Sequence, residues 1–183
     1  MYSMMNLLMT SAPLAMKLCG LRVSDSNFGI QWHIVAMYGP SFFTGSLIGR
    51  FGAPKIVALG LMLEAAGAAI GLSGITAMHF WATLFVLGIG WNFAFVGASA
   101  LVLETHRPQE RNKVQAFNDF LVFGMMAVGS FSSGQLLAHY GWSAVNMVVF
   151  PPVLLGLGIL MFASFAKRRA QLSAVDEFPE PSI

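Results

Sequence analysis

The sequence predicts an all-α membrane protein with six transmembrane helices, arranged as two inverted three-helix repeats. Three observations carry this prediction. Of the 183 residues, 56% are hydrophobic and 10% are charged, whereas ordinary soluble domains carry about 25% charged residues. The chain also contains six apolar runs long enough, at about 1.5 Å per helical residue, to cross about 30 Å of hydrocarbon. Finally, a pattern in the second run recurs in the fifth.

The six predicted spans form one transmembrane domain, residues 1–166. The first run starts at Met1 and is barely long enough to cross, so we expect the chain to be truncated there. The second span is expected to kink at Tyr38-Gly39-Pro40. Residues 167–183 end in a polar, acidic, proline-bearing segment, which predicts a disordered cytoplasmic tail. The spans are expected at about residues 1–19, 28–49, 55–75, 78–103, 114–138 and 143–166.

The basic residues predict the orientation of the chain. With six spans, successive loops alternate between the two sides of the membrane, and Lys17 and Arg22 lie on one side. The other eight basic residues lie on the opposite side. Cytoplasmic loops are enriched in Lys and Arg, so both termini are expected in the cytoplasm. The eight residues are Arg50, Lys55, Arg107, Arg111, Lys113, Lys167, Arg168 and Arg169.

The recurring pattern lies at the ends of the second and fifth spans. Its first copy places Arg50 on the cytoplasmic side of the membrane, and its second copy places His139 on the outer side. Its two copies are offset by 89 residues, and an odd number of membrane crossings inverts the second copy, as in many secondary transporters. The alternative is a chance recurrence of Ser, Phe, Gly and Leu in apolar helices. The copies are Ser41-Phe-x-Thr-Gly-x-Leu-Ile-x-Arg-Phe-Gly52 and Ser130-Phe-x-Ser-Gly-x-Leu-Leu-x-His-Tyr-Gly141.

The turn Gly45-Ser-Leu-Ile-Gly-Arg-Phe-Gly-Ala-Pro-Lys55 resembles the loop signature of the major facilitator superfamily. That signature joins the second and third helices of each six-helix half. The sequence departs from it at Gly49, where the amino-terminal half usually has an aspartate, and at Pro54, where a basic residue is usual. The loop Glu104–Lys113 is similar to the pattern that follows the fourth helix of a half. The matched residues of the turn are Gly45, Leu47, Arg50, Gly52 and Lys55.

The resemblance implies one six-helix half of a twelve-helix transporter, and the missing acid at Gly49 fits the carboxy-terminal half better. It also implies that the first and fourth helices line the substrate cavity. Asn92 lies near the middle of its span, where secondary transporters place their sites. The alternative is that Asn92 joins helices and that the aromatic residues are packing. The cavity candidates are Thr10, Ser11, Trp91, Asn92, Phe95 and Ser99.

Two titratable residues inside the spans are candidates for proton coupling. Glu64 shares a helical face with Gly60 and Gly67, which permit close helix approach. It is either a coupling group or a protonated acid bonded to a neighbouring helix, and the resemblance favours the second interpretation because the third helix of a half packs away from the cavity. His33, near the outer end of its span, is either a titrating gate or an interfacial residue.

A set of charged residues at three cytoplasmic helix ends is a candidate gate. Opposite charges gathered there are able to lock one conformation of an alternating-access cycle. The alternative is a group of solvated helix-end charges, each of little energetic weight. The gate candidates are Arg50, Glu104, Arg107, Arg111 and Asp119.

The sequence contains no nucleophile elbow, zinc motif or phosphate-cradling loop, which argues against an enzyme and predicts no cofactor and no metal site. We therefore expect transport of a small solute, with proton coupling left open, in the plasma (inner) membrane. The expected partners are the lipid bilayer, the substrate, and either the missing amino-terminal half or a second copy of the chain. Nucleic acid is not an expected partner. The alternative function is a truncated or structural membrane protein that does not transport on its own.

Overall fold

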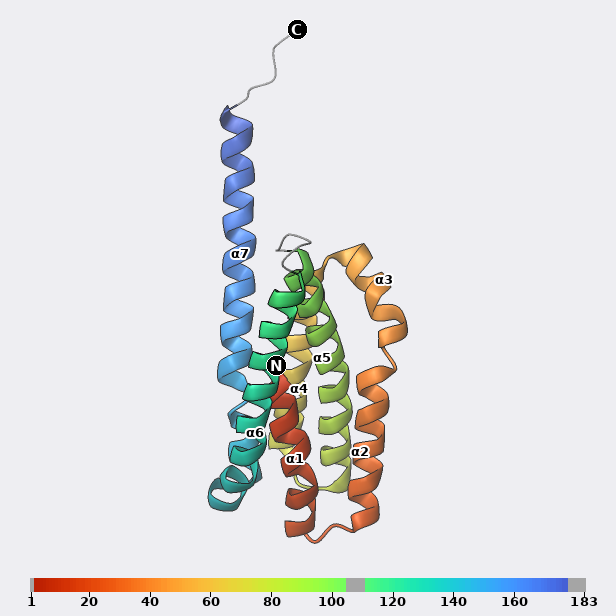
Figure 1. Cartoon of the computed structure of the whole chain (residues 1–183). Helices are drawn as coiled ribbons and strands as arrows, with labels where there is room; N and C mark the ends of the chain where they lie inside the picture. Colours follow the sequence, from red (N-terminus) through yellow and green to blue (C-terminus); the bar gives the residue numbers. More distant parts are fainter. Residues whose placement is uncertain (1, 105–110, 178–183) are drawn as a thin grey trace.

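A computed structural model describes residues 2–104 and 111–177, and these ranges are helical apart from short connections. The prediction of an all-α protein is confirmed for this part of the chain. The bundle is drawn in Figure 1. Its helices are α1 (Tyr2–Leu18), α2 (Val23–Tyr38), α3 (Ser41–Phe51), α4 (Ala53–Ser73), α5 (Ala77–Glu104), α6 (Arg111–Met147) and α7 (Phe150–Glu177).

Three segments of the described chain are long and apolar enough to cross a membrane, judged by length and composition. They are Ala53–Ser73, Ala77–Val102 and Asn112–Ala166, and the last contains parts of both α6 and α7. The helices α1, α2 and α3 have 17, 16 and 11 residues, fewer than the roughly 20 residues that one continuous span needs. The predicted second span is divided between α2 and α3.

Helix α5 lies at the centre of the bundle, against α2 on one side and α4 on the other, while α6 packs along α1 (Figure 1). Glycines allow the backbones of these helices to approach closely. A Cβ atom placed on Gly90 of α5 would lie 2.9 Å from the backbone nitrogen of Glu64 in α4, and one on Gly88 would lie 2.7 Å from the carbonyl oxygen of His33 in α2. Small residues at helix contacts are the usual means of tight packing in membranes.

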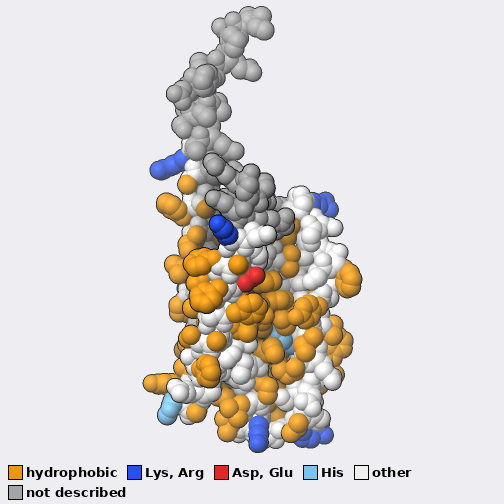
Figure 2. All heavy atoms as spheres, viewed as in Figure 1, with side chains coloured by type: hydrophobic (Ala, Val, Ile, Leu, Met, Phe, Trp, Pro, Cys, Tyr) orange, Lys and Arg blue, Asp and Glu red, His pale blue; other side chains and the backbone are white. Residues whose placement is uncertain are grey.

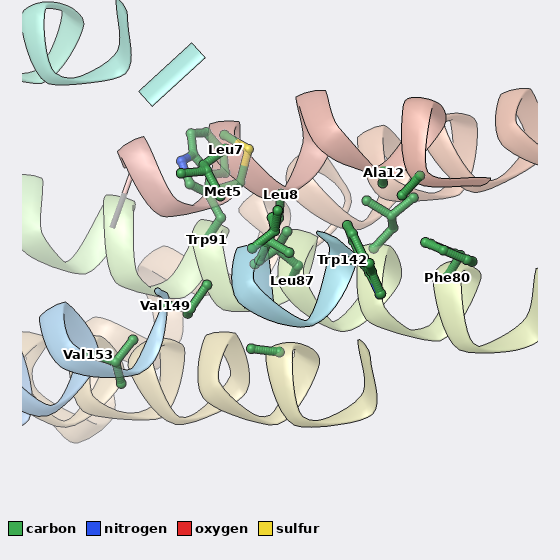
Figure 3. Close-up of a cluster of buried hydrophobic side chains, with 14 of the residues drawn as sticks. Met5, Leu7, Leu8, Ala12, Phe80, Leu87, Trp91, Trp142, Val149 and Val153 are labelled. Atoms are coloured by element: carbon green, nitrogen blue, oxygen red, sulfur yellow. The ribbon is translucent and has the colours of Figure 1, made fainter. Parts of the chain in front are cut away.

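The buried core lies where α5 meets α1, α4 and the helix ends around Trp142 and Val149 (Figure 3). The outer surface is apolar as well. Figure 2 shows hydrophobic side chains over most of the face in view, with Lys and Arg towards its two ends. Phe42 and Phe131 are 95% and 83% exposed, which suits side chains that face lipid rather than water.

The break between α2 and α3 lies at Gly39 and Pro40, so the predicted kink is confirmed. Proline has no N–H to continue the helical hydrogen bonds. A second break consists of one residue, Gly52, which separates α3 from α4. Its backbone has φ of 87° and ψ of 145°, a combination that is readily reached only by glycine.

Helix α7 differs from the prediction, because it continues to Glu177. The expected disordered tail begins at residue 167, yet residues 167–177 extend the helix beyond the rest of the bundle (Figure 1). The apolar run and the basic residues after it form one uninterrupted helix, since no proline or glycine occurs between Gly158 and Glu177. Residues 178–183 lie outside the described part of the chain.

Candidate functional site

A cavity of about 320 Å³ lies between the start of α1, the second half of α5 and the first half of α6. Its volume is at the lower end of the range for small-molecule sites, roughly 300–1,000 Å³. Most of the wall is apolar, with hydroxyl and amide groups at a few positions. The lining residues are Tyr2, Ser3, Phe95, Ala98, Ser99, Val102, Asn118, Leu121, Val122 and Met125.

An aromatic cluster borders this cavity. The Phe95 ring is stacked on the Trp91 indole, with centroids 4.9 Å apart and planes 8° apart. The Tyr2 ring meets both of them edge-on, at 5.4 Å from Trp91 and 5.6 Å from Phe95, and Tyr38 meets Trp91 from α2 at 6.2 Å. Figure 3 shows Trp91 extending from α5 towards α1, beside Met5. Such contacts hold the planes of the rings in place.

Asn92 does not line the cavity; it joins α5 to the break between α2 and α3. Its Nδ2 donates to the Met37 carbonyl oxygen and lies within hydrogen-bond distance of the Ser41 hydroxyl oxygen, both at 2.7 Å, while its Oδ1 lies 2.6 Å from the Thr44 hydroxyl. The side chain is 1% exposed. Every polar atom of the amide has a protein partner, so the structure supports the interpretation of Asn92 as an interhelical tie.

The two candidates in α1 lie away from the cavity. The Ser11 hydroxyl is buried and donates to the carbonyl oxygen of Ser133 in α6, at 3.3 Å. Thr10 is exposed and donates to the Asn6 carbonyl oxygen of its own helix at 2.6 Å. Thr10 lines a separate hollow near Lys17. Of the six cavity candidates, Phe95 and Ser99 line the cavity and Trp91 supports it from behind.

Three residues in or near the cavity were not predicted from the sequence. Tyr2 and Asn118 line the cavity, and Asn6 donates from α1 to the Met126 carbonyl oxygen at 3.3 Å and to the Ser130 hydroxyl in α6. Asn6 and Thr10 are four residues apart on one helical face, which is a signal for a polar stripe in α1. The position of Asn118 depends on how α6 is rotated, which its sequence alone does not specify.

Glu64 is fully buried, and neither of its carboxylate oxygens has a hydrogen-bond partner among the described residues. It lies in the tight contact between α4 and α5, where its backbone nitrogen faces Gly90. The predicted hydrogen bond from a protonated Glu64 to a neighbouring helix is not present among the described residues. An ionised carboxylate without a partner is costly in an apolar interior, so this environment favours the neutral acid.

His33 is also fully buried, packed between α2 and α5. Its Nδ1 lies 2.6 Å from the Leu84 carbonyl oxygen. A carbonyl oxygen only accepts hydrogen bonds, so Nδ1 carries the proton and donates. Nε2 is buried without a partner among the described residues. The His33 ring is thus enclosed between helices, whereas Trp32 next to it is 46% exposed.

The structure describes the side chains of two candidate gate residues, Arg50 and Asp119. Arg50 lies over the Phe51 ring, 5.3 Å from its centroid. Asp119 accepts hydrogen bonds from Gln115 at 2.8 Å and from Asn118 at 3.4 Å. Among the described side chains, Arg50 and Asp119 do not form an ion pair. Arg107 and the side chains of Glu104 and Arg111 lie outside what the structure describes.

Known proteins share sequence features with this chain. The family model for the Major Facilitator Superfamily matches residues 1–182. The riboflavin transporter RfnT of Brucella anthropi is 53% identical over 156 residues, which cover 85% of this chain and 39% of the relative. The uncharacterized MFS-type transporters YddS and YdeG of Bacillus subtilis are 32% and 30% identical over 78% and 77% of this chain, and over 33% of each relative.

The chain therefore spans between about a third and two fifths of the length of these relatives. The family match, in contrast, extends over almost every residue of the chain. The helical bundle, the apolar surface and the loop motif after α3 agree with that match. The chain belongs to the Major Facilitator Superfamily.

Proposed function

We propose that this chain is one six-span half of a secondary transporter, which moves a small solute across the membrane by alternating access together with a complementary half. The observation that carries the proposal is the cavity between α1, α5 and α6, in a chain that matches the superfamily from residue 1 to residue 182. In this role the chain acts as part of a membrane-embedded transporter and not as an enzyme. The solute site lies between two halves, as is usual in such carriers.

Riboflavin is the first solute to test. The relative with 53% identity over 85% of this chain is a riboflavin transporter. The cavity is compatible with a flat, partly polar solute, because it combines the Phe95 ring with the Ser99 hydroxyl and the Asn118 amide. The substrate assignment applies to the complete carrier, since the chain covers 39% of that relative.

We further propose that the six spans form two inverted three-helix repeats. The two copies of the repeated pattern support this arrangement at matched positions. Thr44 and Ser133 are both buried, at 0% and 1% exposure, whereas Phe42 and Phe131 are both highly exposed. Each copy also forms a hydrogen bond with a helix of the other proposed repeat. The Thr44 hydroxyl donates to Asn92 in α5, and the Ser133 carbonyl oxygen accepts from Ser11 in α1.

The proposed location is the plasma (inner) membrane, with both termini in the cytoplasm. The orientation is supported by the uneven distribution of Lys and Arg between the two sides. In this orientation, the connection from α1 to α2 faces outwards, and the connection from α3 to α4 faces the cytoplasm.

Proton coupling by Glu64 and His33 remains a proposal, supported by buried atoms of both side chains that have no partner among the described residues. The gate formed by Arg50, Asp119 and the charged residues near them is likewise a proposal for the complete carrier. The structure places Arg50 over the Phe51 ring, 5.3 Å from its centroid.

The chain alone is proposed to be a poor transporter, because alternating access rocks one half against another around the site. The test is uptake of riboflavin into proteoliposomes containing the chain together with the part of RfnT that has no counterpart in it. We expect uptake with both parts and none with either part alone. Intact RfnT is the positive control. If intact RfnT transports while the combined parts remain inactive, or if the chain transports alone, the proposal is wrong.

A further inference from the structure

The aromatic cluster beside the cavity joins three helices at one side chain. Its members come from α1, α2 and α5, yet all of them meet at Trp91. Phe95 is only partly buried and lines the cavity. Its ring therefore offers the cavity an aromatic surface whose plane is already fixed by the Trp91 indole behind it.

A second feature of the cluster is an unsatisfied donor. The indole Nε1 of Trp91 is buried without a partner among the described residues, although Trp91 itself is 5% exposed. Buried indole N–H groups usually have an acceptor. This donor belongs to the residue one helical turn before Phe95, the ring that faces the cavity.

Polar groups of the cavity come after Phe95 along α5, whereas the Trp91 indole comes before it. Ser99 follows Phe95 by one helical turn on α5, and Asn118 faces the same cavity from α6. The cavity thus combines aromatic surface from Phe95 and Tyr2 with hydroxyl groups and the Asn118 amide. A flat ring with polar atoms along its edge matches this combination, whereas a flexible polyol makes no use of the aromatic surface.

We infer that Tyr2, Tyr38, Trp91 and Phe95 form a stacking platform for the ring of a planar heteroaromatic solute, whose polar edge meets Ser99 and Asn118. This inference rests on the proposed function, because it assigns the solute class of the same cavity. It concerns binding, however, and is testable without any measurement of transport.

The test uses the full chain in lipid nanodiscs and titrates lumichrome, an uncharged fluorescent tricycle, following the quenching of its emission. Phe95→Leu removes the aromatic surface at a partly buried position. Phe85→Leu is the matched control, because Phe85 is also on α5 but pairs with Trp32 at 6.3 Å, away from the cavity. Far-UV circular dichroism and thermal unfolding verify that each variant is folded.

We expect saturable quenching that Phe95→Leu weakens about tenfold, the upper end of what one aromatic pair contributes. Phe95→Tyr should restore binding, and Phe85→Leu should bind as the unmodified chain does. An excess of ribitol, a polyol without a ring, should not displace lumichrome. The inference is overturned if lumichrome does not bind up to its solubility limit, if both Leu variants bind equally, or if ribitol competes.

The outcomes separate this inference from the proposed function. Selective stacking without riboflavin uptake by the combined halves would support the platform and remove the transport proposal. Uptake that is unchanged by Phe95→Leu in the combined halves, together with unchanged lumichrome binding, would support transport and remove the platform.

Discussion

Gly52 and Gly141 both have a positive φ, 87° and 76°, with an extended ψ of 145° and −179°, although they are 89 residues apart. Each ends one copy of the repeated pattern, and a new helical segment starts directly after each. The equivalence extends from the sequence to the backbone. Both positions need a residue without a Cβ atom, because other residues are strained at this φ.

Replacing either glycine by alanine should destabilise the bundle by roughly 1–3 kcal/mol, the usual cost of a sparsely populated backbone conformation in a residue with a Cβ atom. Unfolding in a denaturing detergent measures the change. Gly45→Ala and Gly134→Ala are matched controls: they occupy equivalent positions in the same two copies, are helical, and have open space around a new Cβ. These controls should be neutral or slightly stabilising. Equal effects at all four positions would contradict the explanation.

Asn92→Ala should destabilise the chain by about 1–3 kcal/mol, because it leaves the Met37 carbonyl and the Thr44 hydroxyl without the amide, and each interhelical bond in a membrane contributes roughly 0.6–1.7 kcal/mol. Exposed Asn27→Ala on α2 is the control and should have no effect. A double-mutant cycle with Thr44→Val should show coupling between the two residues. Additive effects would show that the 2.6 Å contact carries little energy.

Glu64→Gln should leave the stability of the chain within about 0.5 kcal/mol, since glutamine matches the size of a neutral acid in the same site. Glu64→Lys should unfold or severely destabilise it, because a fixed charge would be buried without a partner. Detergent unfolding measures both variants. A large loss of stability in Glu64→Gln would mean that the carboxylate is ionised and paired. In the complete carrier, loss of proton-driven uptake in Glu64→Gln would support its coupling role.

Arg50→Ala and Asp119→Asn should have additive effects on the stability of this chain, within about 0.5 kcal/mol, because the two side chains have separate partners. The same cycle in the complete carrier, with uptake as the readout, tests the proposed gate. There, Asp119→Asn should partly rescue the loss caused by Arg50→Ala. If the effects are additive in both settings, Arg50 only sets the orientation of the chain.

Cys19, which is exposed, should react with a membrane-impermeant thiol reagent from outside intact cells. In a Cys19→Ser background, a cysteine at Ser24 should behave in the same way, because both positions lie at the connection from α1 to α2. A cysteine at Ser173 should react only after the membrane is opened. Labelling of Ser24 and Ser173 from the same side would contradict the proposed orientation.

Local sequence signals predicted much of the fold. Gly39-Pro40 predicted the kink, because a proline inside a span has no N–H to donate to the preceding turn, and Gly52 marked the turn after α3. The roles of Asn92 and His33 were not predictable in the same way, since each depends on which carbonyl group the neighbouring helix presents. The extent of α7 was missed because the composition of residues 167–177 indicates polarity, whereas the helix there continues from the apolar run before it.

The amide of Asn92 also sets an order of events during synthesis. The ribosome makes α2 and α3 well before α5, so the bend between them enters the membrane while the group that will bond the Met37 carbonyl has not yet been translated. An exposed carbonyl at a bend is poorly tolerated in lipid. When α5 packs beside α2, Asn92 supplies the donor for that carbonyl, so a later helix stabilises a bend that an earlier segment forms.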